Sequence, residues 1–356
     1  MKTIKIIFSC VIVGFVLMAV FTTNTDPEAV SMIDNRRLVK WKGDIDPYFQ
    51  DRIGFRDRMI HGYTVYNDHV FNEMIHPLYE YGKNGHLFEK LTEEVYDSVH
   101  LDAFCSYLKR VQDYCEKRGA KFVFCLNPNK STIYPQYLPE GYRFQAHFYQ
   151  LVTERLRFYG IHYVDNVALL QKIGKIEQVF NYKYDILHWN DIGAYYGMNH
   201  LLEEMAKDFP AIIPWKLSDF EVQTVLRKNL PLSSLVIDEV VPKYVLRKNE
   251  AEETTERYDT LKIHPGYPVY FTYETDKADC PSVLFFQDSY CYSWNKFYCD
   301  RFKFVAGLQH CKNLSNFEYY FEVFKPDYVV IAAVERMLSV TFRLPTKEEF
   351  ASLVLE

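Results

Sequence analysis

The sequence is poor in the residue patterns that bind nucleotides, metals and nucleic acids. Its 356 residues include only 14 glycines, and none of them forms a glycine-rich phosphate-binding loop. No His-x-x-x-His or Cys-x-x-Cys spacing offers a metal site. Lys and Arg number 41 against 47 Asp and Glu, whereas nucleic-acid binders usually carry a basic excess. We therefore expect no cofactor, no metal and no nucleic-acid partner.

The chain has enough apolar residues to build a large folded core. Hydrophobic residues make up 48% of it and charged residues 25%, a balance typical of globular proteins. Of its eight cysteines, Cys10 lies in the N-terminal apolar stretch, and the other seven cannot all pair because their number is odd. We assign no disulfide, and we expect Cys125 and Cys280 to act as small buried apolar residues.

One long hydrophobic run lies at the N-terminus. Lys2 and Lys5 precede an apolar stretch from Ile6 to Phe21, which is about long enough to span a bilayer. No small-x-small cleavage site follows it. Basic residues before a span keep that end in the cytoplasm. Residues 1–24 are therefore predicted to be a signal anchor, a single-pass helix in the cell membrane, with the rest of the chain outside the cytoplasm. A cleaved signal peptide is the alternative and places the body in the same compartment.

Short apolar runs alternate with segments of helical spacing along the body of the chain. This rhythm predicts an α/β fold with a mostly parallel sheet. The predicted strands are 121–126, 161–164, 282–286, 302–305 and 328–331, and the predicted helices are 94–118, 141–158 and 191–207.

The predicted domains follow from this rhythm. Residues 25–93 form an N-terminal extension with a hairpin at the Asn84-Gly85 turn, and residues 94–356 form the α/β domain. Residues 212–280 break the alternation and are predicted to be an insertion with antiparallel strands and a solvated charged tip.

Two short motifs supply the groups of a serine nucleophile system. Asp185 and His188 stand three residues apart, and Ser289 follows the apolar run that ends in Gln287-Asp288. A serine hydroxyl needs an imidazole to take its proton and a carboxylate to orient that imidazole. Residues that follow a buried parallel strand lie where α/β sheets usually bind ligands. The pattern favours Ser289 as nucleophile, His188 as base and Asp185 as orienting group.

Simpler interpretations exist for the same residues. An Asp-Ser pair occurs by chance in most proteins of this size. Asp is also a favoured helix N-cap, so Asp185 can be the N-cap of the predicted helix 191–207. Trp189, Tyr290 and Trp294 are next to the motif residues in sequence; they can form a sugar-stacking wall or pack in the core.

Several segments, taken in order, resemble the alginate O-acetylation proteins. These proteins are SGNH-hydrolase-like, membrane-anchored or periplasmic, and related to the families named for an Asp-His-His-Trp motif. The resemblance covers residues 35–335 apart from the insertion. Its landmarks are Asp46–Arg56, Tyr81–Phe88, Asn127-Pro-Asn-Lys130 with Tyr134-Pro135, Asp185–Gly193, Gln287-Asp-Ser289 and Pro326-Asp-Tyr-Val-Val.

The resemblance implies a three-layer SGNH-like sandwich with Ser289, His188 and Asp185 as the catalytic residues. It also implies that Asn129 and Lys130 are oxyanion or substrate ligands; a capped turn after a strand is the alternative. Two departures stand out. Gln287 replaces the usual glycine before Asp-Ser, which is expected to crowd the turn. The Asp and His are three residues apart rather than two, a spacing common among SGNH hydrolases generally.

Three functions follow as hypotheses. The first is O-acyl transfer, most simply O-acetyl transfer, to an extracytoplasmic polysaccharide, with the acyl group delivered by a membrane-bound acyltransferase as family analogy suggests. The second is an esterase, in which water accepts the acyl group. The third is a non-catalytic polysaccharide-binding or assembly protein on the same fold, for which Gln287 is the best support in the sequence.

Overall fold

The structure is a computed structural model that describes residues 2–31, 36–71, 73–75, 79–90, 97–139, 142, 147–229, 236–339, 349–350 and 355. The chain folds into two compact units. The first contains Met1–Tyr81, Lys183–Asp185 and Leu226–Glu239, and the second contains Gly82–Tyr182, Ile186–Val225 and Val240–Glu356. The domain boundary predicted at residues 93 and 94 falls outside the described residues.

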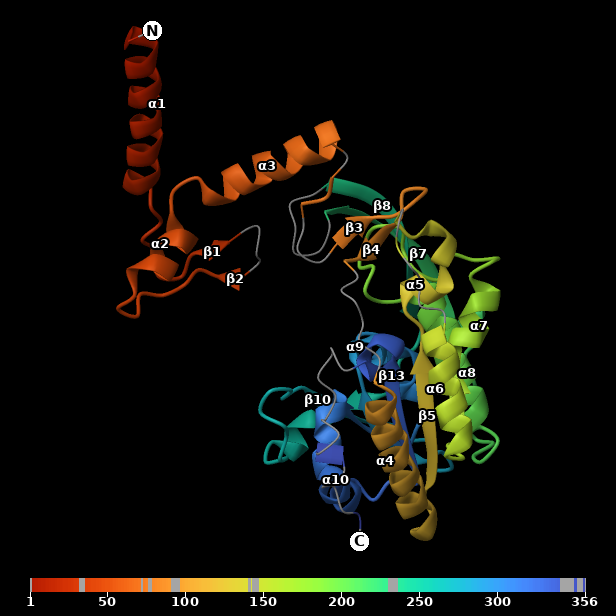
Figure 1. Ribbon diagram of the computed structural model, residues 1–356. Coiled ribbons are helices and arrows are strands. Elements are labelled where there is room, and N and C mark those ends of the chain that lie inside the picture. Colours follow the sequence, from red (N-terminus) through yellow and green to blue (C-terminus); the bar gives the residue numbers. More distant parts are fainter. Residues whose placement is uncertain are drawn as a thin grey trace. The chain divides into compact units, whose positions relative to one another are not determined.

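The second unit is built on a central sheet, which has seven strands within the described residues (Figure 1). Five neighbouring strands run parallel, and β10 and then β9 join their edge in the antiparallel sense. The predicted α/β fold with a mainly parallel sheet is therefore confirmed. The order across the sheet is β6 (Tyr163–Asp165), β5 (Lys121–Asn127), β13 (Tyr328–Val334), β11 (Ser282–Gln287), β12 (Phe304–Gln309), β10 (Tyr270–Glu274) and β9 (Glu252–Glu253).

Helices cover both faces of the sheet. Successive strand residues point to opposite faces, and because the central strands are apolar at nearly every position, both faces need a covering layer. Phe124, Ile331 and Phe286 are register partners on one face. Phe104 of α4 (Ser98–Lys117) meets Phe124 at 5.7 Å between ring centroids, and Phe317 of α10 (Phe317–Phe324) meets Phe286 at 5.8 Å. The three strand residues therefore face a helical layer formed by α4 and α10.

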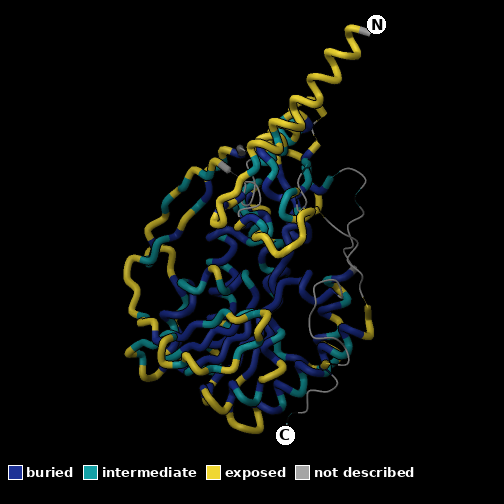
Figure 2. Tube along the Cα trace, turned by 90° about the vertical axis from the view of Figure 1, so that its left-hand side faces the viewer, coloured by how far each residue is buried: buried dark blue, intermediate teal, exposed yellow. Residues whose placement is uncertain are grey.

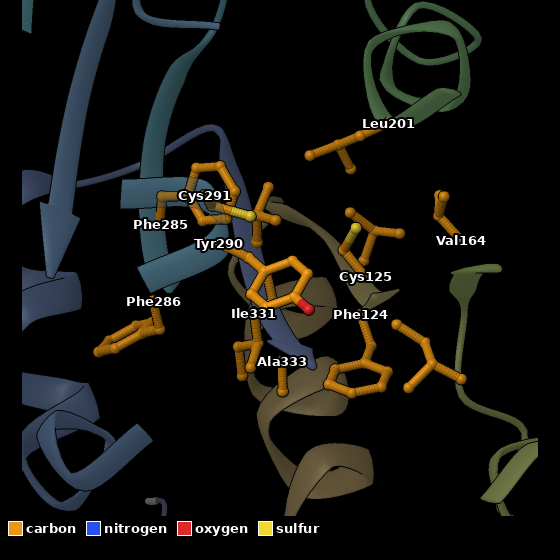
Figure 3. Close-up of a cluster of buried hydrophobic side chains, with 14 of the residues drawn as sticks. Phe124, Cys125, Val164, Leu201, Phe285, Phe286, Tyr290, Cys291, Ile331 and Ala333 are labelled. Atoms are coloured by element: carbon orange, nitrogen blue, oxygen red, sulfur yellow. The ribbon is translucent and has the colours of Figure 1, made fainter. Parts of the chain in front are cut away.

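The opposite face is covered by α7 (Asn166–Ile173) and α8 (Asp191–Met205). Asn166 donates its side-chain amide to Asn127 at the end of β5, and His200 of α8 lies 2.9 Å from the Asn166 amide oxygen. Figure 3 shows the buried side chains that fill the space between the layers, with Tyr290 and Cys291 among those of β5, β11 and β13. Both layers therefore pack on strands that end beside the predicted motifs.

Other helices and strands of the second unit include β4 (Leu87–Glu89), α5 (Lys130–Ile133), α6 (His147–Phe158) and α9 (Ser289–Tyr292). The predicted hairpin is present as the two-stranded sheet of β3 (Tyr79–Tyr81) and β4. β7 (Phe220–Asn229) and β8 (Val236–Leu246) form a separate two-stranded sheet. The antiparallel strands predicted for 212–280 are thus present, although β9 and β10 extend the central sheet rather than stand apart from it.

The first unit begins with α1 (Lys2–Phe21), which is exposed along nearly its whole length (Figure 2). Its stretch Thr3–Phe21 is long and apolar enough to cross a membrane, which makes it a candidate anchor. The unit continues with β1 (Val30–Ser31), β2 (Arg36–Arg37), α2 (Ile45–Arg52) and α3 (Arg56–Phe71).

Element bounds differ from the sequence prediction in a few places. The predicted strand 302–305 begins two residues later and extends to Gln309, and helix 191–207 ends at Met205. The first residues of the predicted helices 94–118 and 141–158 include positions outside the described part of the chain. All eight cysteines lie in the described residues and are free, and every one except Cys10 is buried.

Candidate active site

Ser289 lies on a tight turn between β11 and α9, at the carboxyl edge of the sheet. Asp288 forms this turn: one carboxylate oxygen accepts the Tyr290 N–H at 2.9 Å, and the other accepts the Val334 N–H at 2.6 Å. The turn is thereby tied to the end of the neighbouring strand, β13. Burial raises the pKa of Asp288, against the two backbone N–H donors and the nearby Arg336 charge, which lower it. Asp288 therefore fixes the position of the serine rather than orienting an imidazole.

His188 lies beside Ser289, although the two residues are far apart in the sequence. Nε2 of His188 is 2.8 Å from Oγ of Ser289, within normal hydrogen-bond distance. The imidazole is flanked by Tyr290 at 5.3 Å and Trp294 at 5.7 Å between ring centroids. In the neutral tautomer protonated on Nδ1, Nε2 can accept the serine proton. The structure therefore brings together the nucleophile and the base that the sequence predicts.

The segment before His188 corrects one alternative for Asp185. The N-cap of α8 is Asn190, whose side-chain oxygen accepts the N–H groups of Ile192 and Gly193, so Asp185 is not that cap. Asp185 has a positive φ of 45°, in the left-handed region that Asp and Asn tolerate better than most residues. Its role as orienting carboxylate stays a prediction.

Lys130 has a structural position rather than an open one. It is only 4% exposed, and its ammonium donates to the carbonyls of Leu87, Asn181 and Tyr182 at 2.7–2.8 Å. Because these three bonds use the three ammonium hydrogens, Lys130 has none left for a substrate. These bonds favour a structural role, in which the lysine holds the segment that leads to His188. The role of Lys130 as a substrate ligand stays a prediction.

Asn129 lies at the edge of the site, and its side-chain oxygen, but not its NH₂ group, is hydrogen-bonded within the described residues. Its backbone N–H donates to Glu335 at 2.7 Å, and its side-chain oxygen accepts from Arg336 at 3.2 Å. No hydrogen-bond partner of its side-chain NH₂ group is present among the described residues. Asn129 also lines a small cavity of about 20 Å³ with Ile186 and Arg336. A predicted role as hydrogen-bond donor to a substrate therefore remains open to it.

Arg336 is the residue that sequence reasoning missed. It follows β13 and donates to the Leu187 carbonyl at 2.9 Å, while its other terminal nitrogen reaches Asn129 and the Tyr290 hydroxyl. Its guanidinium therefore joins the chain segments that carry His188, Ser289 and Asn129. The one sequence signal was its place directly after a buried strand, where sheet-edge sites form.

The three aromatic residues next to the motifs differ in exposure. Trp189 is 1% exposed and donates its indole N–H to the Tyr290 carbonyl, and Tyr290 is fully buried. Their burial favours core packing over an open sugar-stacking wall. Trp294 is 9% exposed beside His188, and its indole N–H donates to Asp191 at 2.6 Å.

Asp191 connects Trp294 to the surrounding structure. Its second carboxylate oxygen accepts the Lys296 ammonium at 2.6 Å and the Tyr244 N–H at 2.7 Å. A single carboxylate thus fixes the indole that flanks the imidazole. Of the three aromatic residues, Trp294 is the least buried.

Gln287 does not crowd the serine turn. Its side chain points into the core, where the Tyr298 hydroxyl donates to the Gln287 carbonyl oxygen at 2.5 Å. The space exists because Gly307 on the adjacent strand lacks a side chain: a Cβ there would lie 2.6 Å from the Gln287 amide nitrogen. The expectation that Gln287 disturbs the turn is therefore wrong.

Within the described residues, no group of three His, Cys, Asp or Glu residues is placed to hold a metal ion.

A serine at the end of a parallel strand, within hydrogen-bond distance of a histidine from a preceding segment, is the arrangement of a serine nucleophile and its base. Residues 80–259 match the family described as the SGNH hydrolase-like domain of the acetyltransferase AlgX. The chain belongs to this family, and the predicted resemblance is confirmed. The matched range includes Asp185 and His188 and ends before Ser289. No curated protein matches the chain in sequence.

Solved structures show the same fold at low sequence identity. Bacillus cereus PatB1 is 13% identical with a TM-score of 0.58, over 73% of this chain and 97% of that one. The O-acetyltransferase domain of Pseudomonas putida AlgJ is 18% identical with a TM-score of 0.53, over 78% and 99%. A DHHW family protein from Eubacterium siraeum is 17% identical with a TM-score of 0.53, over 79% and 100%.

Proposed function

We propose that this protein transfers an O-acyl group, most simply an acetyl group, to an extracytoplasmic polysaccharide through an acyl-enzyme on Ser289. The observation that carries the proposal is the 2.8 Å contact between Ser289 Oγ and His188 Nε2 at the carboxyl edge of the sheet. This distance is within the range expected for a serine and its general base. It favours catalysis over a purely binding role.

The reaction has two halves in which the same imidazole moves the proton. His188 takes the hydroxyl proton of Ser289 as its oxygen attacks the acyl carbonyl, and returns that proton to the leaving group of the donor. A sugar hydroxyl then gives its proton to His188 and attacks the acyl-serine ester. The products are the acylated sugar and the free serine, with the proton back on Ser289.

Two groups are the proposed donors to the oxyanion that forms in each half. The backbone N–H of Ser289 begins α9 and has no hydrogen-bond partner within the described residues. The Asn129 side-chain NH₂ is the second donor we assign. Such donors stabilise developing negative charge in acyl transfer, and the loss of one typically lowers kcat by about 10²–10³-fold.

Asp185 is proposed to hold the His188 tautomer from the ring nitrogen remote from Ser289. Asp185→Asn is the sharp test, because Asn also tolerates the left-handed backbone at φ 45° and so keeps the fold. We expect turnover to fall by orders of magnitude with unchanged stability, as the amide can stabilise the wrong tautomer. Full activity in Asp185→Asn would remove this residue from the site.

The compartment and the partners follow from the N-terminal helix and the family. Thr3–Phe21 is proposed to anchor the protein in the cell membrane with the catalytic unit outside the cytoplasm. The AlgJ neighbour is an O-acetyltransferase domain by its name, which supports O-acetyl transfer. The glycan acceptor is part of our proposal. A membrane-bound acyltransferase is proposed as the source of the acyl group.

Transfer is tested with the full-length protein, an acetyl ester donor and a panel of oligosaccharides, with acylated sugars detected by mass spectrometry. Ser289→Ala should abolish both donor cleavage and sugar acylation. The matched control is Ser293→Ala, an exposed serine four residues further on, which should retain both. Donor cleavage without sugar acylation would identify an esterase, and full turnover in Ser289→Ala would refute the acyl-enzyme.

A further inference from the structure

The loop between α2 and α3 is packed on the C-terminal end of α1. The Gly54 N–H donates to the Ala19 carbonyl at 2.9 Å, and the Asn24 N–H donates to the Arg52 carbonyl at 2.8 Å. A Cβ at position 54 would lie 1.8 Å from the Thr22 hydroxyl oxygen, so only glycine permits this approach. Arg52 is buried and donates to the carbonyls of Asn24 and Asp26. These contacts fix the depth of the loop relative to the apolar helix.

An apolar cavity of about 520 Å³ lies between the last turns of α1 and this loop. The lining from α1 is Phe15, Val16, Met18, Ala19 and Val20, and the lining from α2 and α3 includes Phe49, Phe55 and Met59. Arg58 is the one charged residue in the lining. Such a cavity offers room for hydrocarbon, with a cation at its border that can reach a lipid phosphate by extending its side chain.

The apolar surface continues along α3. Met59, Tyr63, Tyr66 and Val70 are spaced by four, three and four residues, which places them on one face of the helix. Each is 55–58% exposed. The helix begins near the C-terminal end of α1, after α2, and runs crosswise to α1 (Figure 1). An exposed apolar stripe of this kind, with tyrosines in it, is typical of helices that lie in a membrane interface.

We propose that this α2–α3 surface, formed by Phe49, Phe55, Met59, Tyr63, Tyr66 and Val70, inserts among the lipid acyl chains of the outer leaflet. The inference rests on the proposed anchoring by α1. The 19 residues of Thr3–Phe21 span about 28 Å as a helix, close to the roughly 30 Å of bilayer hydrocarbon. Because the helix is no longer than the hydrocarbon layer, its last turns must lie within the lipid. Phe49, Phe55 and Met59, which line the same cavity, then lie at that depth too.

Lipid is the occupant that this geometry favours over a protein partner. A cavity walled by a membrane-spanning helix at the depth of the outer leaflet is already surrounded by acyl chains. The proposed surface thus gives the protein a second, interfacial attachment, which sets the orientation of the first unit on the membrane.

The test uses the full-length protein in nanodiscs of phosphatidylcholine and phosphatidylglycerol whose acyl chains carry bromine, a contact quencher of tryptophan. The parent chain has four tryptophans. The emission added by each introduced tryptophan is the fluorescence of the variant minus that of the parent chain under the same conditions. Met59→Trp, at an exposed position that needs no repacking, should lose most of its added emission in bromolipid. Tyr63→Trp repeats the measurement one turn along the same stripe.

The matched control is His61→Trp, an exposed position two residues from Met59 on the opposite face of α3. Its added emission should be quenched by aqueous iodide and not by bromolipid. Phe15→Trp reports on the anchor, and acetyl ester turnover reports on folding and on the catalytic unit. If Phe15→Trp is quenched by bromolipid while the α3 stripe and His61→Trp respond alike to iodide, the inference is overturned and the anchor stands. If Phe15→Trp is not quenched either, the inference and the anchor both fail, while turnover still tests the catalytic proposal.

Discussion

Lys130→Met is the substitution that separates a structural lysine from a substrate ligand. Methionine has a similar length and no hydrogen-bond donor, so the change removes the ammonium from the carbonyls of Leu87 and Asn181. The Tyr182 carbonyl loses it too but keeps the Leu87 N–H as a donor. An unsatisfied buried carbonyl costs about 1–3 kcal/mol. Release of the buried ammonium from its own desolvation penalty, several kcal/mol, offsets part of this sum. We expect a net loss of about 2–4 kcal/mol in the free energy of unfolding.

The assay is denaturant unfolding of the full-length protein in detergent, followed by tryptophan fluorescence, together with acetyl ester kinetics. Lys248→Met is the control, since the Lys248 side chain is 80% exposed and such surface changes stay within about 0.5 kcal/mol. Because Asn181 and Tyr182 lead to His188, kcat should fall in Lys130→Met as the imidazole loses its support. An unchanged unfolding midpoint with a raised KM would refute this reasoning and restore Lys130 as a substrate ligand.

Three further predictions follow from buried polar groups. Gln287→Gly should lower stability by roughly 2–4 kcal/mol in denaturant unfolding without raising turnover, because it leaves a cavity and an unpaired Tyr298 hydroxyl; a gain in turnover would mean that the glutamine does crowd the serine. Burial, followed by the charge of the nearby Lys130 ammonium, lowers the pKa of His86 from 6.5 to about 3. Between these pH values His86 is protonated in the unfolded chain but not in the folded one, so the free energy of unfolding falls as pH drops from 6.5 toward 3. His86→Phe should flatten the dependence of melting temperature on pH over that range, and an unaltered slope would contradict this. Asp191→Asn should cost about 1–3 kcal/mol and lower kcat rather than raise KM, since the indole and ammonium groups that share the carboxylate lose their common partner; a change confined to KM would argue against a positioning role.

The parts of the fold that the sequence predicts are those encoded by local patterns. The apolar runs at 121–126, 282–286 and 328–331 correspond to β5, β11 and β13, because buried parallel strands are continuous apolar segments. Ser289 and His188 were predictable for a related reason: each follows a recognisable local motif, and the carboxyl edge of a parallel sheet is where such residues meet.

The parts that the sequence did not reveal depend on contacts between distant segments. Arg336 contacts Leu187 and Asn129, which are separated from it by 149 and 207 positions, and no local pattern encodes such pairings. The backbone partners of Lys130 are equally non-local. Asn190 rather than Asp185 caps α8 because the cap is set by where the helix begins, and element boundaries are the weakest part of pattern reasoning.

Exposure was the other property that sequence position left undetermined. Trp189, Tyr290 and Trp294 are all adjacent in the chain to the proposed catalytic residues, yet the first two are buried in the core. Gln287 likewise occupies a position where the family resemblance suggests glycine, and only the absence of a side chain at Gly307 explains how it fits.

The most direct test of the central claim is to trap the acyl-enzyme. The full-length protein is mixed briefly with an acetyl ester donor, quenched in acid and digested, and the peptides are analysed by mass spectrometry. The account predicts one acetyl group on the peptide that contains Ser289, located on that serine by fragmentation and absent from Ser289→Ala. Acetylation at another residue, or donor turnover that persists in Ser289→Ala without any acetylated peptide, would contradict it.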